Sequence, residues 1–231
     1  MSTTSTAVST APDLSLYRDL HQAMRTATEQ LVVGIETLPA SDTARATALG
    51  TWFAGYSGEL RVHHHVEDTI FFPALRGRGP IDELPWDRLL VEHHDLDRVI
   101  DELAASFRSL TTDPTDWTTT SERAFGLAVE LRDLLAEHLD IEDDEVLPLI
   151  ETRFTAEEYD ALDHRAIKTV PFRQLRFTVP WMMATLHPDA AERLRAGARP
   201  TMRVLWKITR GRYERLVKRA FGQGRSVPPW A

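Results

Sequence analysis

Histidine and glutamate recur at a metal-chelating spacing in two stretches of the chain. His63 and Glu67 are four residues apart, and His138 and Glu142 repeat that spacing 75 positions later. Residues four apart on a helix lie on the same face, about one turn apart, so each pair can point at one place. Each pair is also followed by an acid and then by a proline six positions after the Glu. One such pair alone is better explained as a core histidine beside a surface acid, but two matched pairs favour a metal site.

Two further histidines precede these pairs at similar distances. His21 lies 42 residues before His63, and His93 lies 45 residues before His138. All four histidines fall on otherwise apolar helical faces, and a carboxylate directed into such a face is costly unless a cation accompanies it. The residues predicted as metal ligands are therefore His21, His63, Glu67, His93, His138 and Glu142.

Apolar residues at helical spacing predict the elements that must position these ligands. Long helical segments are expected at about 14–38 and 43–75, after Pro85, and after Pro114. Short connections make successive helices antiparallel, so the predicted fold is all-α, an up-down-up-down four-helix bundle with a helical C-terminal extension. Each of two helical hairpins then contributes one His from its first helix and a His-x-x-x-Glu pair from its second.

The composition restricts the chemistry of the site. The chain has no cysteine, which excludes disulfides, thiolate zinc sites, Cys-ligated iron–sulfur clusters and cysteine nucleophiles. Four imidazoles and two carboxylates suit iron, manganese or zinc, and two acidic bridges suit a dinuclear centre. No His follows an acid by three positions, so the Glu-x-x-His pattern of ferritin-like bundles is absent.

Charge divides the chain into two parts. Residues 1–154 carry 12 basic against 28 acidic side chains, a net charge of −16, whereas residues 155–231 carry 15 against 7, a net charge of +8. We therefore expect a disordered leader at 1–13, a bundle at 14–152 and a basic helical extension at 153–231. A basic amphipathic helix at about 200–221 could meet an anionic surface, but we favour its folding back onto the acidic bundle or forming a homodimer contact.

Location and macromolecular partners follow from what the sequence lacks. The first residues show no secretory signal, and the longest apolar stretch, 179–186, contains Pro180 and is far shorter than the ~20 residues of a membrane span. We expect a cytoplasmic protein without stable membrane insertion. No helix-turn-helix or RNA-binding signature accompanies the basic residues, so a nucleic-acid partner is not expected.

The combined pattern resembles the hemerythrin-like, or HHE cation-binding, domain over about residues 14–150. The resemblance implies two non-haem irons, oxo- or hydroxo-bridged, with Glu67 and Glu142 bridging, four histidines as terminal ligands, and an open position for dioxygen, nitric oxide or peroxide. Oxygen-carrying hemerythrins of marine worms have His where this chain has Asp97, and Asp where it has Glu142. An additional carboxylate favours ferric iron, so reversible oxygen carriage is not expected.

Three functions stay open at this point. The first is a di-iron protein that binds or senses a small ligand (dioxygen or nitric oxide) or iron. The second is a di-iron redox enzyme that reduces peroxide or nitric oxide, and the third is a bundle that zinc merely braces. No catalytic side chain is assigned.

The roles of several neighbouring residues also stay open. His64 either borders the site or joins it as an extra ligand, and Asp97 is either a seventh ligand or an acceptor that orients His93. Tyr17 is a core residue or a wall of the metal pocket. The remaining polar neighbours are expected to be solvated: His65, His94, Asp68, Asp143, Asp144 and Glu145.

Overall fold

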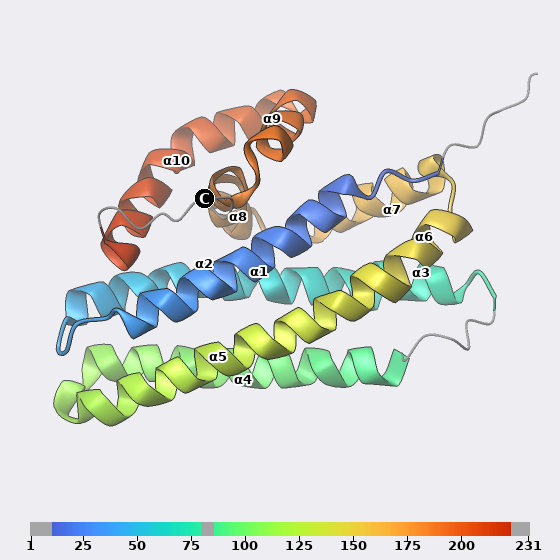
Figure 1. Cartoon of the computed structure of the whole chain (residues 1–231). Coiled ribbons are helices and arrows are strands. Elements are labelled where there is room, and N and C mark those ends of the chain that lie inside the picture. Colours follow the sequence, from blue (N-terminus) through green and yellow to red (C-terminus); the bar gives the residue numbers. More distant parts are fainter. Residues whose placement is uncertain (1–10, 80–85, 223–231) are drawn as a thin grey trace, which may run out of the picture.

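A computed structural model describes residues 11–79 and 86–222, and these residues form helices without any strand (Figure 1). Most of the predicted leader and residues 223–231 of the predicted extension lie outside the described residues. No helix within the described ranges combines the length and the apolar character that crossing a bilayer requires.

Four long helices make the bundle. They are α1 (Ser15–Glu36), α2 (Thr43–Val66), α4 (Trp86–Thr112) and α5 (Trp117–Ile141). Figure 1 shows the chain running along these helices in alternating directions. Helix α1 packs on α2, α2 on α4, α4 on α5, and α5 on α1, so each helix has two neighbours around a shared interior. The predicted all-α hemerythrin-like bundle is confirmed.

The turns between paired helices follow from local sequence. Asp42 is the N-cap residue of α2, and its side chain accepts a hydrogen bond from the Arg45 backbone N–H at 2.9 Å. Such an N-cap satisfies a donor that has no partner within the helix. A short 3₁₀ segment, η2 (Pro114–Asp116), leads into α5. Both connections are short, which makes the paired helices antiparallel.

A π-helical turn begins at each predicted ligand Glu. The turns are η1 (Glu67–Phe71) and η3 (Glu142–Val146), and they lead into α3 (Phe72–Arg76) and α6 (Leu147–Arg153). In both, the backbone N–H that follows the turn donates to the carbonyl of the ligand Glu, five residues back. The helix continues past Pro73 and Pro148, which lie in the first turns of α3 and α6. Such turns are rare and often occur at functional sites.

A layer of polar side chains divides the apolar interior of the bundle. The larger apolar cluster includes Leu31, Trp52, Leu103 and Leu131, and the smaller one includes Leu14, Phe72, Leu89 and Leu147. On α2 and η1 the change from the larger to the smaller cluster falls between Leu60 and Ile70, which flank His63 and Glu67. The predicted ligands therefore lie between two water-excluding layers.

The extension folds back onto the bundle, the arrangement that the sequence favours. It consists of α7 (Ala156–Thr169), α8 (Phe172–Thr185), α9 (Pro188–Gly197) and α10 (Pro200–Phe221). Helices α8 and α10 pack on α2, α9 packs on α1 and α8, and α7 packs on η1. Thr155 and Glu158 form a capping box that starts α7 directly after the bundle.

Aromatic packing, rather than charge pairing, dominates this contact. Trp52 of α2 is fully buried, and its indole Nε1 donates to the Tyr213 hydroxyl of α10 at 3.2 Å. Phe177 of α8 lies so close to Gly55 that a Cβ there would meet its ring at 2.2 Å. The opposite charges of the two parts contribute little to it: Arg193 of α9 pairs with Asp19 of α1 at 3.1 Å. The absence of a side chain at Gly55 is what lets α8 pack so closely on α2.

Candidate metal centre

The structure brings all six predicted side chains to one buried place. Each is at most 6% exposed. They form two groups whose nitrogen and oxygen atoms lie within 4.8 Å of one another. The first ligand set is His21, His63, Glu67 and Glu142; the second ligand set is Glu67, His93, His138 and Glu142. The two carboxylates belong to both sets.

In each shared carboxylate, one oxygen faces a histidine of the first ligand set and the other oxygen faces a histidine of the second. Glu67 Oε1 lies 3.0 Å from His63 Nε2, and its Oε2 lies 3.7 Å from His93 Nε2. Glu142 Oε2 lies 3.5 Å from His21 Nε2, and its Oε1 lies 3.5 Å from His138 Nε2. A carboxylate with this division of its oxygens can bridge two cations.

Several of the nitrogen and oxygen atoms that face one another in the two ligand sets have no hydrogen-bond partner. They are His21 Nε2, His63 Nε2, Glu67 Oε2 and both carboxylate oxygens of Glu142. The contact between His63 and Glu67 is short, but it does not have the geometry of a hydrogen bond. Buried polar atoms without partners are rare, because each costs about 1–3 kcal/mol. Cations bound within the two ligand sets would satisfy all of these atoms.

The spacing of nitrogens in the second ligand set also fits a cation. His93 Nε2 lies 3.2 Å from His138 Nε2. Two nitrogens each about 2.1 Å from one ion and at right angles would be about 3.0 Å apart. The two lone pairs can therefore face one ion without movement of the helices.

Carboxylates hold the other ring nitrogens of two histidines across the bundle. His21 Nδ1 lies 2.7 Å from Asp143, and His93 Nδ1 lies 3.1 Å from Asp68. Such partners fix the ring orientation and raise the basicity of a ligand imidazole. The expectation of a solvated face is wrong for these two acids. Their position directly after a ligand Glu gave no such signal, because on an α-helix it lies about 100° round from that Glu.

Glu92 completes the same arrangement for the fourth helix. It lies 3.0 Å from His138 Nδ1 and also pairs with Arg88. Glu92 belongs to the Glu92–His93 pair that contributes to the family resemblance, but the sequence assigned it no role, because its contact with His138 joins residues 46 positions apart.

The structure also distinguishes between the roles considered for other residues near the predicted ligands. Asp97 is not at the site: its side chain is 51% exposed and accepts from Arg61 at 3.1 Å, so neither role considered for it holds. His65 and His94 are exposed, as expected. The Tyr17 hydroxyl donates a short hydrogen bond to Glu67 Oε1, which makes it a wall of the metal pocket. His64 is buried beside the second ligand set, with its ring stacked on His93.

The two buried carboxylates favour positive charge at the centre. Burial opposes protonation of His63, but the carboxylates of Glu67 and Glu142 outweigh it and raise its pKa to about 10. Burial likewise opposes ionisation of Glu67, yet the neighbouring histidines hold its pKa below the usual range. Burial and the same carboxylates raise the pKa of Tyr17, so its phenol keeps its proton. Without a cation, protons on imidazoles must balance the two buried carboxylates.

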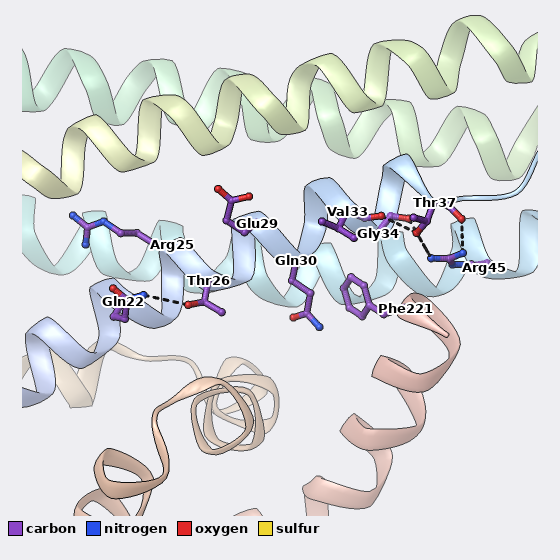
Figure 2. Close-up of a pocket in the computed structure, with 10 residues that line it drawn as sticks. All are labelled: Gln22, Arg25, Thr26, Glu29, Gln30, Val33, Gly34, Thr37, Arg45 and Phe221. Carbon is purple, nitrogen blue, oxygen red and sulfur yellow. Dashed lines mark hydrogen bonds between the residues drawn. The ribbon is translucent and has the colours of Figure 1, made fainter. Parts of the chain in front are cut away.

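A small cavity reaches the first ligand set from the side of the extension. Its volume is about 180 Å³, and Tyr17 and His63 line it together with apolar side chains of α1, α2, α7 and α8. Two acids, Glu59 and Asp163, also face it. Burial raises the pKa of both. A larger cavity of about 370 Å³ lies along α1, where Phe221 reaches it from α10 (Figure 2), and it contains none of the predicted ligands.

Comparisons with known proteins agree with the site. The Hemerythrin HHE cation binding domain matches residues 13–150. The zinc finger protein BRUTUS of Arabidopsis thaliana is 24% identical over 151 residues, 62% of this chain, and a BRUTUS-like zinc finger protein of the same plant is 28% identical over 190 residues, 77% of this chain. The matches cover only 11% and 14% of those plant proteins. No solved structure matches the chain.

Proposed function

Because the chain belongs to the hemerythrin HHE cation-binding domain family, we propose that its bundle holds two non-haem irons and uses them to bind or sense a small ligand. The observation that carries the proposal is the division of Glu67 and Glu142 between two buried histidine sets, with one oxygen of Glu67 and both oxygens of Glu142 lacking a hydrogen-bond partner. His21 and His63 would hold one iron, and His93 and His138 the other. The irons supply the redox and ligand-binding chemistry, and the protein supplies position, charge and access.

The cavity beside Tyr17 supports a ligand of diatomic or peroxide size. Its volume of about 180 Å³ is below the roughly 300–1,000 Å³ of sites for drug-sized molecules. Its apolar walls favour uncharged ligands such as dioxygen or nitric oxide. It borders His63 but none of the histidines of the second ligand set, so a ligand would approach the first set.

A di-iron redox enzyme is the second candidate, and the same cavity favours it. Reduction of peroxide or nitric oxide to water or nitrous oxide consumes protons as well as electrons. Burial holds Glu59 and Asp163 in their protonated forms to higher pH than usual, so they could deliver protons at the cavity. Sustained turnover with an added electron donor would favour this candidate over ligand binding.

The test begins with metal analysis of the purified protein, followed by anaerobic reduction and stepwise addition of dioxygen, nitric oxide and peroxide under optical observation. Two irons per chain, with near-ultraviolet bands that change on oxidation, are expected. His63→Ala and His138→Ala should lose iron, whereas His65→Ala, an exposed neighbour, should not. Stoichiometric zinc without iron would replace the proposal with a structural role for the metal.

Some sequence predictions stay predictions. They are the cytoplasmic location, the absence of a nucleic-acid partner, the domain boundaries at 14–152 and 153–231, and a homodimer through the extension.

A further inference from the structure

His64 is buried without any hydrogen bond from its side chain. It is 4% exposed, and neither Nδ1 nor Nε2 has a partner. A histidine that serves only as packing usually satisfies at least one ring nitrogen. Helix α2 therefore carries two inward imidazoles in succession, His63 toward the first ligand set and His64 toward the other histidines.

The surroundings of His64 are the imidazoles of the second ligand set. Its ring stacks on His93 with centroids 4.3 Å apart and meets His138 edge-on at 5.5 Å. His93 and His138 are themselves 4.7 Å apart. One nitrogen from each of the three rings lies within 4.8 Å of the others.

These separations fit three imidazoles on one ion. A metal–nitrogen bond of about 2.1 Å puts a ring centroid about 3.2 Å from the metal, so ligands at right angles have centroids about 4.5 Å apart. The three observed separations bracket that value. The His64 ring now lies within 12° of parallel to His93, and parallel stacked rings cannot aim at one ion, so binding requires His64 to turn about its Cβ–Cγ bond. Asp97, one turn after His93 on α4, does not compete for this position, because its side chain is turned outward to Arg61.

We propose that His64 is a fifth histidine ligand, which joins His93 and His138 at the second metal position. The inference rests on the proposed di-metal function. It makes the two positions unequal: three imidazoles serve the second, two serve the first, and Glu67 and Glu142 are common to both.

Titration of metal-free protein with ferrous iron under anaerobic conditions tests this assignment. Wild type should bind two ions per chain, and His64→Leu should bind the first ion normally and the second at least about tenfold more weakly. The matched control is His65→Leu, which makes the same change at the exposed neighbouring position and should bind both ions as wild type does.

Thermal melting gives a second readout that a packing role would not produce. Without metal, His64→Leu should melt at or above the wild-type temperature, because leucine of similar volume removes two unpaired buried nitrogens. With metal, it should melt below wild type. Added imidazole should restore the second ion to His64→Gly. A variant that melts lower than wild type to the same extent with and without metal would contradict ligation.

The outcomes separate the two proposals. Fewer than two ions in wild type would overturn the di-metal function itself. Two ions bound with equal affinity by wild type, His64→Leu and His65→Leu would overturn only the role of His64. If His64→Leu does not fold, wild-type protein labelled with ¹⁵N-histidine and loaded with cobalt(II) decides: five strongly hyperfine-shifted imidazoles are expected, and four would contradict the assignment.

Discussion

Helix α2 is buried in two different ways along its length. Around Trp52 and Gly55 it is covered by α8 and α10, through aromatic packing and close approach of backbone. Around His63 and His64 it is covered by polar side chains, several of which have no partner. Around Trp52 and Gly55, protein atoms alone satisfy the buried groups. Around His63 and His64, the buried nitrogen and oxygen atoms need a cation to satisfy them. The difference predicts that the extension stays docked when the metal is removed and that the ligand layer is destabilised.

The largest expected effect is that of Glu142→Gln. Both ligand sets share this carboxylate, and a neutral amide can replace neither its charge nor its bridging, so both ions should bind more than about 100-fold more weakly. Loss of stabilisation by metal present at 1,000 times its Kd removes about 4 kcal/mol, or about 8–16 °C in Tm. Metal content and differential scanning calorimetry measure the two effects.

Glu145→Gln is the control for that variant, because Glu145 is exposed on the same π turn. The near-ultraviolet circular dichroism of the tryptophans, which include the buried Trp52 and Trp181, should be unchanged in Glu142→Gln. A loss of that signal on metal removal would show that the two regions of α2 are not independent.

A smaller effect is expected for Asp143→Asn, which acts on His21 from across the bundle. The amide keeps the shape but weakens the hold on His21 Nδ1, so affinity for the ion of the first ligand set should fall by about 10–100-fold. Asp144→Asn, at the exposed next position, should leave metal affinity unchanged. Competition titration with a chelator of known affinity measures both, and equal losses in the two variants would remove Asp143 from the site.

Gly55→Ala tests the other region of α2. The new Cβ would lie 2.2 Å from the Phe177 ring, so α8 must shift, at a cost of about 1–3 kcal/mol. Gly126→Ala, on an exposed part of α5 with nothing within 4 Å of the new Cβ, should instead stabilise by up to about 1 kcal/mol. Chemical denaturation followed by tryptophan fluorescence compares them. Both variants should bind metal normally if the regions are independent.

The smallest effect is expected for Glu59→Gln, at the border between the regions. Glu59 accepts hydrogen bonds from Thr178 and Gln174 of α8, and burial raises its pKa. A carboxyl with a raised folded-state pKa loses stability as pH rises from its unfolded value through the folded one. Glu59→Gln should therefore match wild type near pH 4 and be more stable, by about 1 kcal/mol, near pH 8. A gain that is the same at both values would exclude the titration of Glu59 as its cause.

Much of the bundle could be predicted because its determinants are local. Helical spacing of apolar residues locates the long helices, and the interval of four between His63 and Glu67 places them on one face whatever the rest of the fold does. The repeat at His138 and Glu142 then leaves little choice about where the helices meet.

Contacts that depend on the rotation and depth of neighbouring helices could not be predicted. Asp68 and Asp143 follow their ligand Glu by one position, which on an α-helix turns them about 100° away, but both lie in π turns, which rotate each residue by less. The inward position of His64 depends on how α2 faces α4. The docking of α8 over Gly55 depends on the absence of a side chain, which leaves no periodic signal.

The crossed pairs His21–Asp143 and His93–Asp68 have a consequence for how the bundle can be divided. In each, the first helix of one hairpin is held by the acid that follows the ligand Glu of the other. Reciprocal contacts of this kind are the mark of an isologous interface, in which one patch meets a copy of itself. The hairpins α1–α2 and α4–α5 are therefore related as two subunits of a symmetric dimer are, and a chain of half the length that paired with itself would bring together an equivalent set of histidines and carboxylates.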